Sequence, residues 1–157
     1  MTNYIQKVAK ECTVIFPIVP SSAFRETMQH LGPFLKPYHI LIHGTKGFDL
    51  KGVTEEALIG RQVNIMREHV STMSEVIRQE SIVVKIGCLS GPNLASEILE
   101  GQPTATVIAS QFTEVIKEGQ GILDSSQFHV FGSHEILGAE LAGALKNIIA
   151  LGSGILG

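Results

Sequence analysis

Lys146 lies in a stretch whose other residues are almost all apolar or small, and Asn147 follows it. In a helix, Ala142, Gly143 and Ala150 would share the face of the lysine, because residues three and four apart are neighbours. Small neighbours leave space for a ligand, and burial favours the neutral form of an amine. A neutral amine can accept a proton, as general acid–base catalysis requires. An equally good interpretation is a lysine whose charge reaches solvent from the helix.

Two loops could bring further groups to this lysine. Residues 45–47 (TKG) and 90–93 (SGPN) each follow an apolar run typical of a strand. In open α/β sheets, ligands bind beyond the carboxyl ends of the strands. Glycines there let a ligand approach the backbone, and Lys46 supplies a cation for a phosphate. Either loop taken alone is more typical of an ordinary strand-to-helix turn.

The other motifs in the chain are weaker evidence for a binding or catalytic site. Residues 152–157 (GSGILG) match the dinucleotide fingerprint G-x-G-x-x-G, but they follow a predicted helix instead of joining a strand to a helix. We interpret them as a glycine-rich helix end. The histidines show no spacing typical of metal ligands, so no metal site is expected. The sequence also lacks a P-loop and the G-x-S-x-G motif of hydrolases.

The apolar pattern alternates between the periods of strands and helices. It predicts strands over 13–19, 40–43, 82–89, 104–109 and 128–131. It predicts helices over 23–31 and 113–123, a short helix capped by Asn93 that carries Leu94, Ile98 and Leu99, and a final helix that Ser133 caps. Strands that alternate with helices over short loops indicate an α/β fold with a mostly parallel sheet and flanking helices.

The longest helical pattern of the chain lies between residues 54 and 77. Its apolar positions follow alternating steps of four and three residues, with Thr54 as N-cap. These positions are Ile59, Val63, Met66, Val70, Met73 and Ile77.

The stretch 136–157 is apolar on nearly every side of the predicted helix, and Glu140, Lys146 and Asn147 are its main polar interruptions. Such a helix belongs inside a larger protein or a membrane. A membrane span needs about 20 mostly apolar residues and tolerates a central lysine poorly. We therefore expect no span, and an apolar surface that requires further protein to cover it.

Composition narrows the possible partners. Apolar residues make up 44% of the 157 residues and charged residues 17%, which excludes intrinsic disorder. A formal net charge of −3 provides no basic field for nucleic acid or an anionic membrane. Cys12 and Cys88 lie far apart in apolar runs, so neither a disulfide framework nor a zinc knuckle is expected. The N-terminus lacks the apolar stretch of a signal peptide, which favours a cytoplasmic location.

Four stretches of the chain resemble the NAD(P)-dependent glycerol-3-phosphate dehydrogenases. They are 14–26 (VIFPIVPSSAFRE), 43–49 (HGTKGFD), 89–110 (LSGPNLASEILEGQPTATVIAS) and 138–155 (GAELAGALKNIIALGSGI), and the last two are the most specific. The resemblance implies an oxidoreductase that interconverts sn-glycerol 3-phosphate and dihydroxyacetone phosphate. Hydride would pass to or from NAD or NADP, in the metabolism of glycerol phosphate and phospholipid precursors.

The resemblance also implies roles for individual residues. Lys146 matches the catalytic lysine, which takes the proton of the C2 hydroxyl, and Asn147 supports the site. Lys46 matches a lysine that contacts both cofactor and substrate.

Three residues of the third stretch match further contact positions of the family. Gly91 and Asn93 correspond to substrate contacts, and Ala95 corresponds to a cofactor contact. Many bacterial members carry Ser or Thr in place of Asn93, a departure that keeps a side chain able to form hydrogen bonds.

By the same resemblance, the chain corresponds to the middle of a family member. Residues 1–132 would be a partial Rossmann-like NAD(P)-binding domain without its first βαβ unit, and 133–157 would begin a helical substrate domain. We therefore expect a truncated sequence with little activity of its own.

Two other interpretations stay open. The chain could be a non-catalytic α/β domain that pairs with another chain, for example as a homodimer, through its apolar C-terminal helix. It could also be another dehydrogenase that acts on a different hydroxy acid, which leaves the paired segments SGPN and GALKN unexplained.

Overall fold

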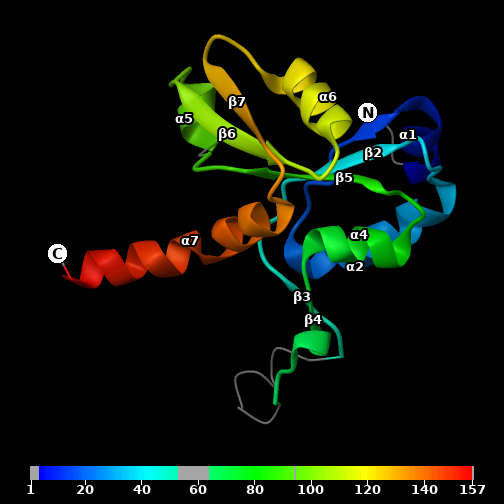
Figure 1. The fold of residues 1–157 in the computed structure, drawn as a ribbon, viewed down its shortest axis with the longest axis horizontal. Helices are drawn as coiled ribbons and strands as arrows, with labels where there is room; N and C mark the ends of the chain where they lie inside the picture. Colours follow the sequence, from blue (N-terminus) through cyan, green and yellow to red (C-terminus); the bar gives the residue numbers. More distant parts are fainter. Residues whose placement is uncertain (1–3, 53–63, 94, 157) are drawn as a thin grey trace.

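A five-stranded sheet forms the centre of the computed structural model, which describes residues 4–52, 64–93 and 95–156. The strands lie in the order β1-β2-β5-β6-β7 (Figure 1). They are β1 (Val14–Ile15), β2 (Ile40–His43), β5 (Lys85–Ser90), β6 (Thr104–Ala109) and β7 (Phe128–Ser133). Strands β5 and β6 are antiparallel, and the other three neighbouring pairs are parallel. The predicted α/β class with a mostly parallel sheet is confirmed.

Helices cover both faces of the sheet (Figure 1). One face packs against α1 (Ile5–Glu11), α2 (Ser21–Leu31), α4 (Met73–Glu80) and the start of α7 (Ile136–Leu156), around a core that includes Phe24, Met28 and Ile77. The other face packs against α6 (Thr113–Leu123) through Val115 and Ile116. The short helix α5 (Ala95–Leu99) joins β5 to β6, and a 3₁₀ turn (Gly32–Phe34) follows α2.

Several predicted elements are found with the bounds that the pattern gave. The strands 40–43 and 104–109 and the helix 113–123 coincide with β2, β6 and α6. These segments are apolar on the faces that the two cores bury, so their local period and their tertiary environment agree.

The strand predicted over 13–19 is too long, because only Val14 and Ile15 pair with β2. Pro17 lacks an N–H that could extend the ladder. The strand predicted over 82–89 begins at Lys85, and the one predicted over 128–131 continues to Ser133.

The long helix predicted between residues 54 and 77 is wrong over its described part. Met66 precedes a 3₁₀ turn (Arg67–His69), and Val70 belongs to β4 (Val70–Ser71), which pairs with β3 (Asp49–Leu50). A new helix, α4, starts at Met73 behind the capping box of Thr72 and Glu75.

The pattern Thr-x-x-Glu, formed by Thr72 and Glu75, marks the start of α4 in the sequence. The prediction overlooked it because the apolar residues on both sides of Thr72 fit one continuous helical period. Thr54, Ile59 and Val63, which also belonged to the predicted helix, lie outside the described residues.

Both predicted caps differ from the structure. The side-chain amide of Asn93 donates a hydrogen bond to Thr106 Oγ1 at 3.0 Å, so it ties its loop to β6. Ser133 is the last residue of β7, and its hydroxyl accepts a hydrogen bond from the N–H of Glu135 at 3.1 Å, just before α7 begins. Leu94 lies outside the described residues, while Ile98 and Leu99 belong to α5 and are exposed.

Candidate functional site

A cavity of about 500 Å³ lies between α7 and the ends of β5 and β7. Its lining is dominated by small residues and includes Ser90, Gly91, Pro92, Val107, Ser133, Glu135, Gly138, Ala139, Ala142, Gly143 and Lys146. Because β2 and β5 are parallel, the loops 45–47 and 90–93 leave the same edge of the sheet. The cavity therefore lies beyond the carboxyl ends of β2 and β5, the position where α/β folds bind ligands.

Small side chains on α7 create the space in this cavity. Gly143 approaches the loop after β5 so closely that a Cβ atom at its position would lie 3.0 Å from Ser90 Oγ. Ala142 and Gly138 line the same wall. As a result, α7 can pass over the loops while the space beneath it stays open.

Lys146 is half-buried and lines the cavity from α7. Lys46, in the loop after β2, lies beside the same helix, since a Cβ on Gly143 would lie 3.8 Å from Lys46 Cγ. Burial lowers the pKa of Lys46, and the nearby charge of Lys146 lowers it further. Two amines that repel each other favour an anion between them. The structure thus brings Lys46, Gly91 and Lys146 to one place.

Of the other predicted site residues, Gly91 lines the cavity, whereas Asn93 and Ala95 do not. A Cβ on Gly91 would lie 2.8 Å from Thr106 Oγ1, so the close contact with β6 requires glycine. Asn93 is half-buried, donates its hydrogen bond to Thr106 and is not among the residues that line the cavity. Ala95 is exposed at the start of α5 and does not line the cavity. The side chain of Asn147 lies outside the described residues.

A buried charged cluster that was not predicted from the sequence lies next to the cavity. Glu140, on α7, accepts hydrogen bonds from the N–H and the hydroxyl of Ser74, each at 2.8 Å. His43, the last residue of β2, lies with its Nε2 3.1 Å from Glu140 Oε1. This is an ion-pair contact without hydrogen-bond alignment, because neither ring nitrogen of His43 has a hydrogen-bond partner among the described residues.

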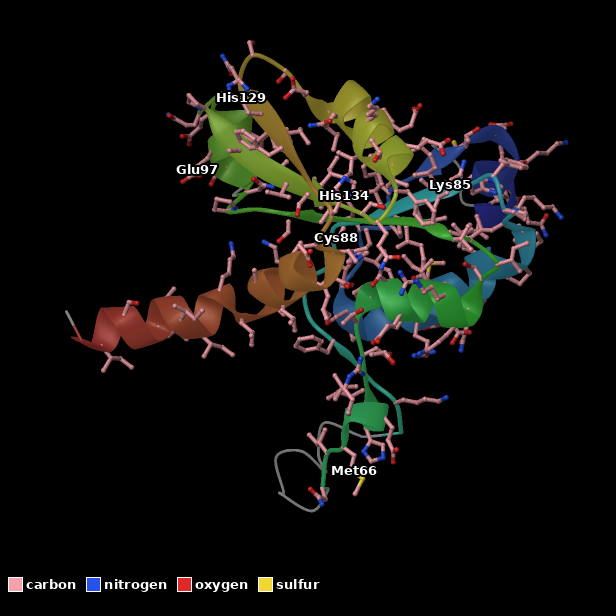
Figure 2. The ribbon with its side chains drawn as sticks, viewed as in Figure 1. Met66, Lys85, Cys88, Glu97, His129 and His134 are labelled. Carbon is pink, nitrogen blue, oxygen red and sulfur yellow. The ribbon has the colours of Figure 1, made fainter. Side chains whose placement is uncertain are left out.

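The surroundings of Glu140 favour its ionised form. Burial opposes ionisation, but the contacts with His43 and Ser74 together outweigh it and lower the pKa of Glu140 below its usual value. Cys88, on β5, lies beside the start of α7 (Figure 2), where burial and the charge of Glu140 raise the pKa of its thiol to about 12. The carboxylate is thus the charged centre of this cluster, and the thiol stays neutral.

One signal in the sequence could have revealed this cluster. Glu140 is the sole carboxylate within the apolar stretch 136–157, and a buried carboxylate is rare unless it has a partner. His43 ends a fully apolar strand, which is also an unusual place for a polar residue. No local pattern could pair the two residues, because 97 positions separate them.

The described residues include no group of three or more His, Cys, Asp or Glu side chains that could hold a metal ion. Within the same residues, no single helix has the length and apolarity to cross a membrane. Two segments of α7, Ile136–Lys146 and Ile148–Ile155, meet these criteria only when taken together, and they are bent by 45°.

Comparison with known proteins gives a consistent match. Residues 1–116 match the family described as the N-terminus of NAD-dependent glycerol-3-phosphate dehydrogenase. The chain is 38% identical over 154 residues to the glycerol-3-phosphate dehydrogenase [NAD(P)+] of Psychrobacter cryohalolentis, with 98% of this chain and 32% of the relative covered. The corresponding protein of Acinetobacter baylyi is 36% identical over 151 residues, with 96% and 37% covered. The chain thus spans about a third of the length of these relatives.

Solved structures show the same arrangement of elements. The glycerol-3-phosphate dehydrogenase of Coxiella burnetii superposes with a TM-score of 0.75 at 27% identity, over 97% of this chain and 41% of that chain. The enzyme of the same name from Saccharomyces cerevisiae superposes with a TM-score of 0.77 over 98% of this chain and 41% of that chain. At 21% identity, the second match supports the fold alone.

Proposed function

The chain belongs to the family of NAD-dependent glycerol-3-phosphate dehydrogenases, and from this premise we propose that it forms part of an oxidoreductase for glycerol 3-phosphate. The enzyme would interconvert sn-glycerol 3-phosphate and dihydroxyacetone phosphate with NAD or NADP, in the supply of glycerol phosphate for phospholipid precursors. One observation carries the proposal: Lys46, from the loop after β2, and Lys146, from α7, lie close together beside a cavity beyond the carboxyl ends of β2 and β5.

Lys146 is the proposed general base of this site. When bound, NAD(P) supplies the acceptor for the hydride that leaves C2 of the alcohol, or the donor in the reverse direction. The amine of Lys146 takes the proton from the C2 hydroxyl, and in the reverse direction it returns the proton to the carbonyl oxygen. Lys146 is half-buried on the cavity wall, so its amine can exchange a proton directly with a ligand that fills the cavity. Asn147, the next residue of α7, supports the site in this proposal.

Lys46 and the loop after β5 are the proposed binding groups. Lys46 provides a second cation close to Lys146, which suits a doubly charged phosphate ester. Gly91 lines the cavity and is the proposed backbone contact of the substrate, and Asn93 fixes the loop through Thr106. Ala95, at the start of α5, is the proposed cofactor contact, and its exposure leaves that surface open to a ligand.

The division of the chain into 1–132 and 133–157 belongs to the same proposal. The first part contains the sheet and the helices packed on it, and α7 extends away from them (Figure 1). We propose that the first part binds NAD(P) and that α7 begins the substrate domain. A cytoplasmic location is also proposed, and it fits two cysteines that are both free in the structure, Cys12 and Cys88.

Substitution of Lys146 tests the proposed function. In a polypeptide extended to the full length of its relatives, Lys146→Ala should lower kcat by about 10²- to 10⁴-fold while cofactor binding is retained. The measurement is the change of NADH absorbance with dihydroxyacetone phosphate. Lys117→Ala, which removes an exposed lysine of α6, is the matched control and should not change turnover. Unchanged turnover in Lys146→Ala would reject the base.

The 157-residue chain alone should show little turnover in the same assay, because it spans about a third of its relatives' length. Robust turnover by this chain would contradict the expectation that the site needs further protein.

A second candidate function is a non-catalytic domain that pairs through α7. Large apolar side chains are exposed along this helix: Leu137, Leu141, Leu145, Ile148, Ile149, Leu151 and Ile155. A contiguous apolar face of this kind favours contact with further protein. A discrete dimer mass in solution would support pairing, whereas aggregation would favour a face that the rest of a longer polypeptide covers.

A further inference from the structure

The cluster of His43, Glu140 and Ser74 links three elements that surround the proposed site. His43 ends β2, Ser74 is the second residue of α4, and Glu140 lies in the first half of α7. The side chains of His43 and Glu140 are almost completely buried. Since the polar atoms of this carboxylate are inaccessible to ligands, its role must be exerted within the protein.

Each residue of the ion pair lies close in sequence to one of the two lysines. His43 precedes Lys46 by three residues, and Glu140 precedes Lys146 by six residues, which is about 9 Å of helical rise. Glu140 is not on the cavity wall, which Ala139, Ala142 and Lys146 form. It therefore holds α7 from the side while another face of the helix presents the lysine.

Each partner of Glu140 is itself fixed. Ser74 lies in the first turn of α4, where free backbone N–H groups and the helix dipole favour a carboxylate, and the capping box of Thr72 and Glu75 holds this turn. His43 packs against the ring of Phe24 in an edge-to-face contact with 5.9 Å between the centroids. The carboxylate thus connects α7 to two rigid points of the core.

The loop that carries Lys46 is held in a similar way. The hydroxyl of Thr45 donates a hydrogen bond to the carbonyl oxygen of Val19 at 2.7 Å. With His43 on one side and Thr45 next to it, Lys46 has a fixed backbone, so the distance between the lysines depends on where α7 is held.

We propose that the ion pair of His43 and Glu140, completed by Ser74, is a positioning element that sets the separation of Lys46 and Lys146. The structural part of this inference is independent of the proposed function, and only the expected effect on catalysis rests on it. None of the three residues touches substrate in this proposal. Among the described residues, the titratable groups that face Glu140 are His43 of β2 and Cys88 of β5.

The titration of Lys46 measures the separation of the lysines without any need for activity. Its pKa is lowered by burial and by Lys146, so movement of α7 away from the loop should raise it. Loss of the negative charge of Glu140 would have the opposite sign, because removal of an anion disfavours an ammonium group. A rise therefore identifies displacement. A loss of overall stability alone would leave the titration of the folded state unchanged.

The experiment is an NMR titration of the lysine side chains in the 157-residue chain, with the Lys46 signal assigned through Lys46→Arg. We expect Glu140→Gln to shift the pKa of Lys46 upward, and Ser74→Ala, which keeps the carboxylate and removes one donor, to shift it less in the same direction. Glu118→Gln, which removes an exposed carboxylate from α6, should leave it unchanged. An unchanged or lower pKa of Lys46 in Glu140→Gln overturns the proposal. If that variant does not fold, Ser74→Ala decides by the same criterion.

A second measurement separates this inference from the proposed function. In a full-length polypeptide, displacement of the base should lower kcat of Glu140→Gln by roughly tenfold to hundredfold, with a smaller change in KM. If Lys146→Ala leaves turnover intact, the proposed function fails, yet the Lys46 titration still tests the positioning element. If Lys146→Ala abolishes turnover and Glu140→Gln moves neither kcat nor the pKa of Lys46, only the positioning element fails.

Discussion

The two halves of α7 have similar compositions but differ in their surroundings. Ile136–Lys146 packs against the sheet and α4, with Ile136 and Glu140 buried. In Ile148–Ile155, which extends away from the sheet (Figure 1), the large side chains are exposed, from 65% for Ile148 to 84% for Ile155. Both halves are rich in isoleucine, leucine, alanine and glycine, so hydropathy alone does not explain why one is held and the other is not.

The difference shows that a buried polar contact can decide the position of an apolar helix. The first half contains one carboxylate that accepts two hydrogen bonds from Ser74 and contacts His43 as an ion pair, and these directional contacts favour one rotation and register of the helix. The second half offers mainly apolar side chains, whose contacts are non-directional and need a partner surface, and the hydroxyl of Ser153 donates its hydrogen bond within the helix, to the carbonyl oxygen of Ile149. A helix of eight residues without tertiary contacts depends on its marginal intrinsic propensity.

Removal of the buried carboxylate should have the largest effect on the stability of the chain. We expect Glu140→Ala to lower the free energy of unfolding by about 3–5 kcal/mol, because the buried N–H of Ser74 would lose its acceptor and His43 its ion-pair partner. Leu151→Ala, in the exposed second half, should change it by less than about 0.5 kcal/mol. Urea unfolding of the 157-residue chain measures both, and equal effects would contradict the contrast between the halves.

The contribution of Glu140 should also depend on pH, with a smaller effect than its removal. The pKa of Glu140 is lowered from 4.5 in the folded state, so its ionised form stabilises the fold above that value, and this stabilisation is lost as the pH falls through the folded pKa. The free energies of unfolding of the native chain and Glu140→Gln should therefore differ most at neutral pH and converge as the pH falls through the folded pKa of Glu140. A difference that does not change with pH would show that Glu140 acts without its charge.

Two glycines of α7 provide the smallest and most local comparison. A Cβ on Gly152 would meet nothing within 4 Å, so Gly152→Ala should raise helix content and gain up to about 1 kcal/mol of helix propensity. At Gly143 the same change places the Cβ 3.0 Å from Ser90 Oγ, so the gain should be smaller or negative. Far-UV circular dichroism and urea unfolding compare the two variants. An equal gain at both positions would mean that the contact between α7 and the Ser90 loop is looser than the structure indicates.

Local pattern was sufficient where one period covered a whole element. The continuous apolar run Ile40–His43 and the helical period of Thr113–Leu123 predicted β2 and α6 with their bounds. Between residues 64 and 77 the prediction from the apolar period was wrong, because strand β4 and helix α4 place their apolar residues at intervals that also fit a single helix. The capping box at Thr72 separates the two elements, and it is a hydrogen-bond signal that a hydropathy period does not contain.

The part of the candidate site that depends on residue type was predicted from the sequence, and the part that depends on contacts between distant elements was not. The lysines and the glycine loops were visible as residue types at the ends of predicted elements, and the resemblance to a family gave them roles that remain proposals. The pairing of His43 with Glu140 was not visible, because it depends on a contact between β2 and α7.

The amino-acid sequence by itself determined the α/β class, several of the elements and the chemical groups available to a site, since these follow from the period of apolar residues and from residue type. The tertiary structure alone decided which half of α7 is buried, where Lys46 and Lys146 meet, and which partners hold Glu140. The physical reason is that burial and ion pairing join residues far apart in the chain, and their free energy depends on distances that no local pattern records.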